Sequence, residues 1–486
     1  MTALAYAALF LWPVVAFVLF RKLGLAQALI ATILWGYLLL PEKVGIDLPI
    51  LPPYDKTLAP ALAALVLAWA ATRRTAREAW FRARREAGGG ARVAVARVSY
   101  GRLGKAVPLL TAALLATPVL TYLTNNYAIY IGDRVLAAVR VYDIFSMSLN
   151  AAVSLLPLFL ARRYLNTPEA RVTLLRYLVF GGLVYTVFIL YEARMSPQLN
   201  RTFYGFFAHS WVQHIRNGFR PIVFLEHGLR VGIFMAMAVL AAATLVRRAG
   251  TGAERMRWLG AMVVLLGALA ISRNLGALLI TLGLLPLVLV APRKLQAWAA
   301  LGIGLLVLFY PIARGSGLVP ATQIVETLQP YAPDRSESLA YRLRNEDVLM
   351  ARANEKPIAG WGLWGRNLVY DPESGALKTI VDGAWVIIIG TRGWIGYLGY
   401  FGLMSLPVIF MALRARKLEL DPVDMGLLLI LCANMIDLIP NSSNGPLLWL
   451  VCGVVWARYE AGPVSRQRAR EGGGRFGRAS PGRRPP

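Results

Sequence analysis

Residues 229–246 read LRVGIFMAMAVLAAATLV, an apolar run with a single charge at Arg230, and Arg247-Arg248 follow it directly. A helix needs about 20 mainly apolar residues to cross the ~30 Å hydrocarbon core of a bilayer. Backbone polar groups in lipid must be satisfied within the segment, which a helix achieves and an isolated strand does not. The run and its arginine pair therefore predict a membrane-spanning helix that ends at a membrane surface.

The same pattern recurs along the chain, which has 486 residues, 57% of them hydrophobic and 16% charged. A soluble protein carries about a quarter charged residues, so this composition favours an integral membrane protein. We predict an all-α, polytopic helical bundle of about 12–13 transmembrane helices. The predicted spans are 3–20, 23–40, 57–72, 106–123, 142–161, 173–191, 229–246, 257–272, 275–291, 296–312, 384–412, 423–440 and 445–457.

The basic residues predict how the chain is oriented in the membrane. The connection 73–105, RRTAREAWFRARREAGGGARVAVARVSYGRLGK, holds ten of them, and short basic connections stay in the cytoplasm. Every second connection from there is also basic, so the net charge of +26 is chiefly an orientation signal. We expect no nucleic-acid partner. The membrane domain covers 1–460, and 461–486, rich in Gly, Pro and Arg, is predicted to be a disordered cytoplasmic tail.

Two outward connections, about 192–228 and 313–383, are unusually long. Connections of this length in a compact protein tend to be functional or disordered. Both contain aromatic residues, apolar stretches, and Pro and Gly at turn-like positions. We therefore predict that both are folded, and that the second forms one large outer loop.

The first of these connections contains all three histidines of the chain, His209, His214 and His227. A metal site is one interpretation, but His209 and His214 are five residues apart and do not share a helix face as an i,i+4 pair does. We expect no metal, and instead an amphipathic helix at the membrane interface. The aromatic residues predicted to lie at headgroup depth are Phe203, Tyr204, Phe206, Phe207 and Trp211.

Three outward arginines are candidate anion ligands. Arg216 and Arg220 flank a Gly turn in RNGFRP (216–221), and Arg273 lies in the tight turn ISRN (271–274). A charge inside a membrane span costs about 2.5–3.5 kcal/mol on insertion scales, so such residues usually face a cavity or a partner. For Arg273 the alternative is an arginine that extends to the membrane surface merely as an anchor.

Acid–base candidates lie near these arginines. Glu226 and His227 begin the span that follows Arg220. The structural alternative is an ion pair of Glu226 with Arg220 or Arg230 that only closes the helix end. Asp382 stands immediately before another span, where a helix N-cap is the competing interpretation.

The second long connection supplies further candidates for binding a glycan or an acceptor. Arg342 and Arg344 lie two residues apart, and Trp361 and Trp364 alternate with glycines in NEKPIAGWGLWG (354–365). Glycine-rich turns allow backbone N–H groups or aromatic faces to approach a ligand closely. Arginine forks suit phosphate and diphosphate. No G-x-x-x-x-G-K-[ST] loop is present, so a lipid-linked diphosphate fits an outward site better than a nucleotide sugar.

At these residues the chain resembles the bacterial O-antigen ligase and polysaccharide polymerase superfamily, polytopic membrane glycosyltransferases. The similarity covers about 190–412. It is carried by GFRPIVFLEHG (218–228), LAISRNLGALL (269–279), NEKPIAGWGLWG (354–365) and DGAWVIIIGTRGWIGYLGYFG (382–402). The resemblance implies an enzyme of the bacterial inner membrane that joins polyprenyl-diphosphate-linked glycan to a glycan or lipid acceptor on the periplasmic side, without a cofactor or a metal.

The resemblance also implies residue roles. Arg220 and Arg273 would bind the diphosphate and stabilise its departure. The ligases place a histidine before the glycine-spaced helix, where this chain has Asp382. That departure favours a polymerase or an unusual ligase-like transferase, with Asp382, His227 or Glu226 as the base. The alternative function is a flippase or transporter of the same lipid-linked oligosaccharide. A flippase should distribute charges along a central path, whereas here polar residues crowd at the outer end.

Overall fold

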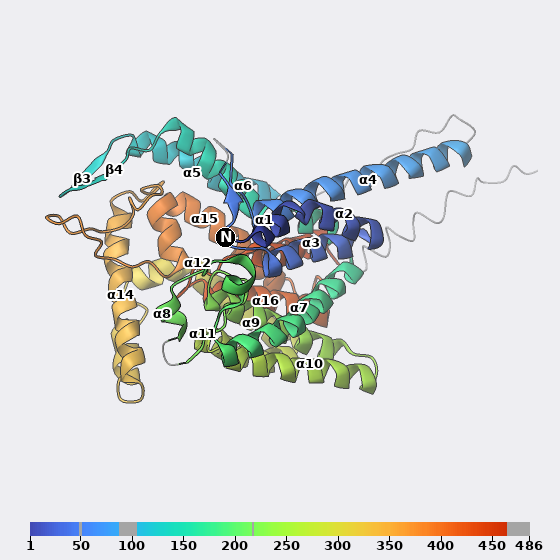
Figure 1. Cartoon of the computed structure of the whole chain (residues 1–486). Helices are drawn as coiled ribbons and strands as arrows, with labels where there is room; N and C mark the ends of the chain where they lie inside the picture. The colour runs from blue at the N-terminus through green and yellow to red at the C-terminus, as the bar shows by residue number, and fades with distance from the viewer. Residues whose placement is uncertain (48–50, 87–104, 216–217, 464–486) are drawn as a thin grey trace, which may run out of the picture.

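The computed structural model describes residues 1–47, 51–86, 105–215 and 218–463 (Figure 1). Within them the fold is all-α apart from two small antiparallel hairpins, which confirms the predicted fold class. The helices are α1 (Ala3–Phe10), α2 (Trp12–Lys22), α3 (Leu25–Leu39), α4 (Leu58–Glu86), α5 (Ala106–Asn125), α6 (Val141–Tyr164), α7 (Pro168–Met195), the π-helix η2 (Asn200–Tyr204), α8 (Trp211–Ile215), α9 (Gly228–Arg248), α10 (Gly252–Ile271), α11 (Leu275–Leu289), α12 (Arg293–Gly315), α13 (Ala321–Leu328), α14 (Pro333–Asn354), α15 (Ala384–Leu413), α16 (Pro422–Asp437) and α17 (Pro446–Ala461). The hairpins pair β1 (Gly45–Ile46) with β2 (Tyr54–Asp55), and β3 (Ile129–Ile131) with β4 (Arg134–Leu136).

All thirteen predicted spans fall on helices, and the first is divided into α1 and α2 by a bend of 42°. Six helices in the described ranges are long and apolar enough to cross a membrane, and the bent pair makes a possible seventh. They are α5, α6, α7, α9, α12 and α15. Helices α3 and α11 are apolar but have 15 residues each, a length of about 22 Å at 1.5 Å per residue. The chain is a multi-pass membrane protein by these candidate spans.

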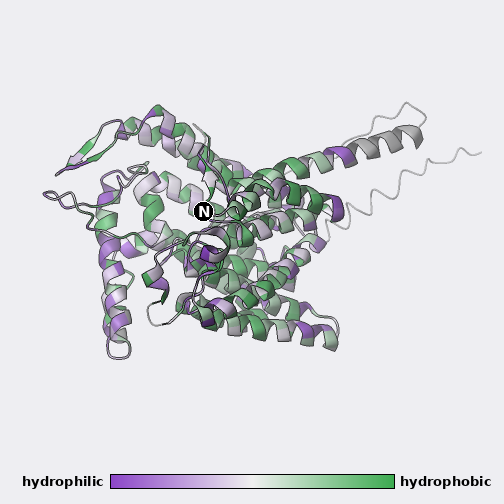
Figure 2. Cartoon of the chain, viewed as in Figure 1, coloured by the Kyte–Doolittle hydropathy of each residue, from purple (hydrophilic) through white to green (hydrophobic). Residues whose placement is uncertain are grey.

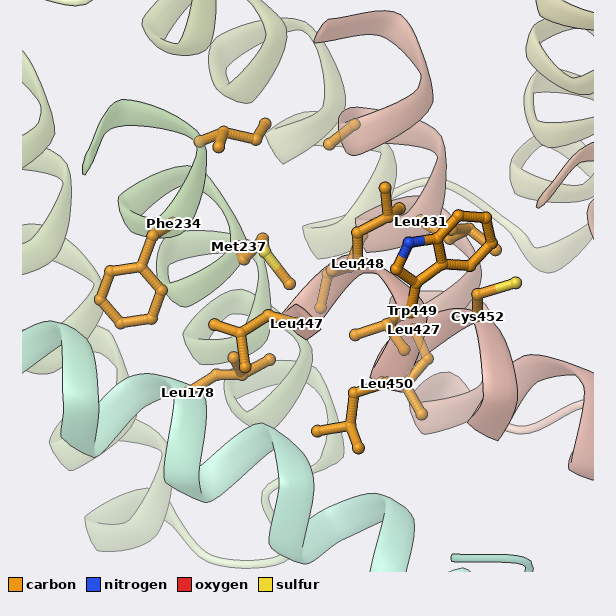
Figure 3. Packing of buried hydrophobic residues seen from close by; sticks show 14 of the residues in the cluster. Leu178, Phe234, Met237, Leu427, Leu431, Leu447, Leu448, Trp449, Leu450 and Cys452 are labelled. Atoms are coloured by element: carbon orange, nitrogen blue, oxygen red, sulfur yellow. The ribbon is translucent and has the colours of Figure 1, made fainter. Parts of the chain in front are cut away.

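Helix α9, formed by the run that opened the sequence, lies at the centre of the bundle. In its most apolar 18-residue window, 89% of residues are buried, the largest share among the candidate spans. It packs against α7, α10, α11 and α16. Phe234 and Met237 of α9 meet Leu178 of α7, Leu431 of α16 and Leu447 of α17 in the packed interior shown in Figure 3.

Small residues let the central helices approach closely. A Cβ added to Gly426 of α16 would lie 2.1 Å from Oγ1 of Thr244 in α9, and one added to Gly453 of α17 would lie 2.2 Å from the carbonyl oxygen of Leu158 in α6. Close backbone approach of this kind is a general source of helix association in membranes, where van der Waals packing replaces the hydrophobic effect. These contacts fix the positions of α9, α16 and α17, on which the outer connections rest.

We call the end of the bundle that carries connections 196–227 and 316–383 the loop end. Backbone and side-chain hydrogen bonds link its parts: Thr2 N donates to Tyr204 O at 3.0 Å, Lys56 Nζ donates to Phe224 O at 2.7 Å, and Arg134 Nε donates to Gly375 O at 2.9 Å. Figure 2 shows polar residues concentrated on α14 at this end, whereas the bundle itself is largely hydrophobic. Both long connections are folded, as predicted.

One boundary prediction is wrong. The basic connection was expected to begin at 73, but α4 continues as a helix to Glu86. The residues from Thr72 to Glu86 include several alanines, arginines and glutamates, which favour helix even after the apolar run has ended. Residues 87–104 lie outside the described part of the chain. So does almost all of the predicted disordered tail, of which only 461–463 are described.

Candidate functional site

The segment 220–227 at the loop end is held by one buried carboxylate. Glu192, at the end of α7 and fully buried, accepts hydrogen bonds from the backbone N–H groups of Leu199 (2.9 Å), Ile222 (2.8 Å) and Val223 (2.7 Å). Val223 has a φ of +56°, a conformation that is an outlier for a β-branched residue and costs energy unless its surroundings impose it. Asn200 Nδ2 adds a hydrogen bond to Val223 O at 2.6 Å. The segment is therefore rigidly positioned.

The three histidines of the chain lie close together at this segment, to which His227 belongs. The ring centroids of His209 and His227 lie 4.5 Å apart, those of His214 and His227 4.7 Å, and those of His209 and His214 5.5 Å. His214 is fully buried, His227 is half-buried and His209 is exposed. One possible ligand atom from each ring lies within 4.8 Å of the others. We call this group the histidine cluster.

The expectation that these residues form one amphipathic helix is wrong, whereas the expectation that they bind no metal stays a prediction. Helix spacing does not apply, because the chain between Tyr204 and Trp211 is not helical. η2 ends at Gly205, whose φ is +74°, and the five-residue α8 begins only at Trp211. His209 lies on the turn, His214 on α8, and His227 comes from the N-cap of α9. The fold therefore brings together three histidines whose spacing in the sequence did not predict a common site.

Hydrogen bonds orient two of the rings. His214 Nδ1 lies 2.8 Å from the carbonyl oxygen of Ser210, so this nitrogen carries the proton and Nε2 keeps its lone pair. His227 Nδ1 accepts from Leu229 N at 3.0 Å and caps α9. Burial, together with the neighbouring Arg220, lowers the pKa of His214 to about 4 and that of His227 to about 3. Both rings are neutral at pH 7.

Arg220 and Arg273, two of the predicted anion ligands, both lie against glycines of the segment 218–228. The Arg273 guanidinium lies against Gly218, where an added Cβ would be 2.4 Å from Nη1. Arg220 lies against Gly228, where an added Cβ would be 2.8 Å from Nε. Arg220 also lowers the pKa of His214 and His227, so it lies near the histidine cluster. We call Arg220 and Arg273 the cationic group. Arg216, the third predicted ligand, lies outside the described residues.

The turn that presents Arg273 is specialised. α10 ends at Ile271 and α11 begins at Leu275, and Arg273 between them has a φ of +57°. Asn274 caps α11 by accepting from Ala277 N at 3.3 Å and donates to Leu229 O of α9 at 3.2 Å. Asn274 also packs on Gly232, where an added Cβ would lie 2.0 Å from Nδ2. These contacts fix the turn to the N-terminal end of α9, which His227 caps.

Glu226 does not join the cationic group but forms the structural pair considered above. Its Oε2 lies 2.6 Å from Nη2 of Arg230, one turn further along. Arg230 also approaches Glu42 at 4.0 Å, and Glu42 pairs with Lys56 at 2.9 Å. Glu42, Lys56 and Arg230 line a cavity of about 210 Å³ that also includes Tyr37 and Asn444. Glu226 is therefore engaged as a helix-end ion pair.

A second group surrounds Asp382. Its carboxylate lies 3.3 Å from Nε of Arg342 on α14, and both residues line a cavity of about 290 Å³ with Glu346. The predicted N-cap role of Asp382 is wrong: Gly383 is the N-cap of α15, and no side chain caps that helix. Ala384 N instead donates to Leu438 O and Asn441 O, so α16 and its following turn already satisfy the helix end. Asp382 is thus open to the cavity.

Glu346 is a site residue that the sequence did not single out. It is 8% exposed, accepts a long hydrogen bond from Trp385 Nε1 (3.4 Å), and lies 3.8 Å from Nε of Arg314. Burial raises the pKa of Glu346 to about 7, although Arg314 and Trp385 oppose that rise. Arg314 pairs more closely with Asp347, at 2.7 Å. Glu346 can therefore exchange a proton near neutral pH.

The two glycine-rich motifs of the second connection also come together. α15 is broken at Gly393, which has a φ of +63°. The carbonyl oxygens of Gly390 and Thr391 at this break accept from Trp361 N (2.8 Å) and Gly362 N (3.0 Å). Segment 357–362 therefore satisfies backbone groups that the broken helix would otherwise leave without partners.

The tryptophans and arginines predicted to contact glycan have different surroundings. Trp361 is 5% exposed, its indole N–H donates to Arg352 O at 2.7 Å, and the Arg352 guanidinium lies 3.4 Å from the ring centre. This placement makes Trp361 a packing residue. Trp364 is 57% exposed, and Arg344 is exposed on α14, so both are accessible to a ligand.

No protein-family model matches the chain, and no curated protein sequence matches it. The functional assignment therefore depends on these two groups of residues and on the membrane-spanning fold.

Proposed function

We propose that this chain is a membrane glycosyltransferase that polymerises or ligates polyprenyl-diphosphate-linked oligosaccharide, with its active site at the loop end on the periplasmic face of a bacterial inner membrane. The observation that carries the proposal is that the guanidinium of Arg273, from the turn between α10 and α11, lies against Gly218, two residues from Arg220 in the segment 218–228. Two guanidinium groups on a fixed backbone suit a diphosphate, because each can donate paired N–H groups to phosphate oxygens.

The reaction needs an acceptor hydroxyl and a leaving group. The acceptor oxygen attacks the anomeric carbon of the donor sugar, the bond from that carbon to the diphosphate oxygen breaks, and the polyprenyl diphosphate leaves with the electron pair. Arg220 and Arg273 stabilise the charge that develops on the departing diphosphate. The hydroxyl proton passes to a carboxylate that acts as general base.

We assign that base to the cavity under α14. Asp382 faces it, and Glu346 in the same cavity has a pKa of about 7, the range in which a general base is most effective at neutral pH. Glu226 and His227 are less suited to this role, because Glu226 pairs with Arg230 and His227 caps α9. Exposed Trp364 and Arg344 are then candidates for holding the growing glycan.

Deleting the gene and measuring the lipid-linked glycan that accumulates tests the proposal. Single repeat units on the outer face would indicate polymerisation, and long lipid-linked polymer would indicate ligation to an acceptor. Units trapped on the inner face would replace the proposal with a flippase. No change in any lipid-linked glycan would reject it.

The arginines are tested in the same strain. We expect Arg220→Ala and Arg273→Ala each to lower glycan assembly by about 100–1,000-fold, the usual effect of removing one donor to a developing oxyanion, while protein level and Tm stay near wild type. Arg201→Ala removes an exposed arginine of the same outer connection and should leave assembly unchanged. Normal glycan from both single variants would remove the diphosphate role.

A further inference from the structure

The histidine cluster has the composition of a transition-metal site. The chain holds three histidines in 486 residues, and all three converge although they come from a turn, from α8 and from the N-cap of α9. Imidazole is a preferred ligand of Zn²⁺, Cu²⁺ and Ni²⁺, whereas Mg²⁺ and Ca²⁺ prefer oxygen. Candidate ligand atoms within 4.8 Å of one another can close on one ion with small side-chain rotations.

The surroundings of His214 match those of a ligating histidine. Histidines that bind metals almost always give their other ring N–H to a carbonyl, carboxylate or water, which fixes the ring and its tautomer. His214 Nδ1 does so with Ser210 O at 2.8 Å, and this ring is fully buried. Its Nε2 lies 3.4 Å from Gly228 N, a weak contact that a coordinate bond readily replaces.

The other two rings differ in how they are held. His227 Nδ1 now caps α9. Ligation replaces that cap: either Nδ1 binds the ion itself, or the ring proton moves to Nδ1 so that Nε2 can bind it. His209 is exposed, so it can turn toward an ion without disturbing the packing.

The charge around the cluster selects the fourth ligand. Arg220 and Arg230 both act electrostatically on His227, so a cation there is favoured only when an anion accompanies it. Three histidines leave one tetrahedral position open, as in zinc sites that bind substrate or water. A phosphate or carboxylate oxygen in that position would balance the positive charge.

We propose that His209, His214 and His227 bind one transition-metal ion, with Zn²⁺ the best match, and that an oxyanion completes its coordination. The proposal depends on the geometry of the histidine cluster and holds whether or not the chain transfers glycan. It adds to the loop end a site that the expected metal-free chemistry does not include.

The full chain, purified in detergent with a tag that contains no histidine, provides the test. Because all three histidines belong to the cluster, any imidazole-bound metal must report on it. After removal of metal with a chelator, the protein is titrated with Zn²⁺ for binding and Tm, and with Co²⁺ for its visible absorption. We expect one ion per chain, a higher Tm with Zn²⁺, and the intense Co²⁺ absorption of a tetrahedral site.

Variants separate the site from general surface binding. His209→Ala removes an exposed ligand, so it should weaken Zn²⁺ binding at least tenfold and abolish the Tm increase while the metal-free Tm is unchanged. Gln213→Ala, exposed on α8 beside His214, should bind as wild type does. Wild-type binding by His209→Ala, fewer than one ion per ten wild-type chains, or a weak octahedral Co²⁺ spectrum would each overturn the proposal.

Discussion

Two groups of charged residues at opposite ends of the bundle use arginine in different ways. At the end opposite the loop end, Asp424 of α16 pairs with Arg171 of α7 at 3.0 Å and with Arg458 of α17 at 2.7 Å, all nearly inaccessible to solvent. Arg458 also donates to Leu418 O and Gly462 O. At the loop end, Arg220 lies near two of the three histidines and Arg273 lies against Gly218, and the nearby carboxylate of Glu226 pairs with Arg230 instead.

The difference separates a structural from a functional use of charge. A buried carboxylate that pairs with two arginines, one of which also donates to two carbonyl oxygens, joins three helices to one another. We propose that the arginines and neutral imidazoles on the segment at the loop end serve instead to bind an anion or a metal–anion pair. If this is correct, mutations at the first group should change stability, and mutations at the second should change binding and activity.

Asp424→Ala should have the largest effect on stability. It leaves Arg171 and Arg458 buried without their carboxylate, and breaking a buried pair on one side costs about 3–5 kcal/mol. We expect low membrane expression and a strongly reduced Tm, measured by intrinsic tryptophan fluorescence in detergent. Arg162→Ala is the matched control, because Arg162 pairs with Glu460 at the same end but less deeply, with 11% of its side chain exposed. A Tm for Asp424→Ala equal to that of the control would contradict a structural role.

Glu192→Gln should have an intermediate effect at the loop end. The amide keeps one acceptor oxygen but presents an NH₂ group to backbone N–H groups that now face a carboxylate, and each buried donor left unsatisfied costs about 1–3 kcal/mol. Val223 should then leave its left-handed conformation and displace Arg220. We expect a Tm loss smaller than that of Asp424→Ala but a clear loss of glycan assembly and of Zn²⁺ binding.

Its control is Glu169→Gln, an exposed substitution on the same helix, which should change neither property. If Glu192→Gln lowers the Tm while assembly and Zn²⁺ affinity stay at wild-type levels, Glu192 serves stability alone, and the rigid segment is not part of the site.

Much of the fold follows from the sequence because lipid imposes a length and a composition on each span. Residues 229–246 predicted α9 to within two residues at either end. The end of α4 was missed because a helix in water needs no apolar run once its residues favour helix. The sequence also identified Arg220 and Arg273 as candidates, because a charge next to an apolar span is costly unless it faces a cavity or a partner.

The organisation of the outer connections was not predictable from spacing. The histidine cluster depends on a chain reversal after Gly205, and the five-residue separation of His209 and His214 argues against it. Glu192 looked like the polar end of a span, and its three backbone partners lie 7, 30 and 31 residues away. The burial of Glu346 depends on contacts of α14 with α12 and α15, including Tyr310 and Trp385, which are distant in sequence.

Glu346 is intermediate between these two groups, since its carboxylate lies near an arginine without forming a close ion pair. Burial raises its folded pKa from 4.5 to about 7, against the opposing influence of Arg314, while Asp347 and Asp382 add to the rise. A raised carboxyl pKa means that ionisation opposes folding, so this contribution to stability is complete below about pH 4.5 and is lost as pH rises to about 7. Because Glu346→Gln cannot ionise, its Tm should exceed that of wild type by an amount that grows from pH 4.5 to 7 and stays constant above pH 7. The control is Glu337→Gln, an exposed substitution on α14, whose Tm should follow that of wild type at every pH. Parallel Tm profiles for Glu346→Gln and wild type across this range would mean that the pKa of Glu346 is the same in the folded and the unfolded chain, and would remove it as a base that works near neutral pH.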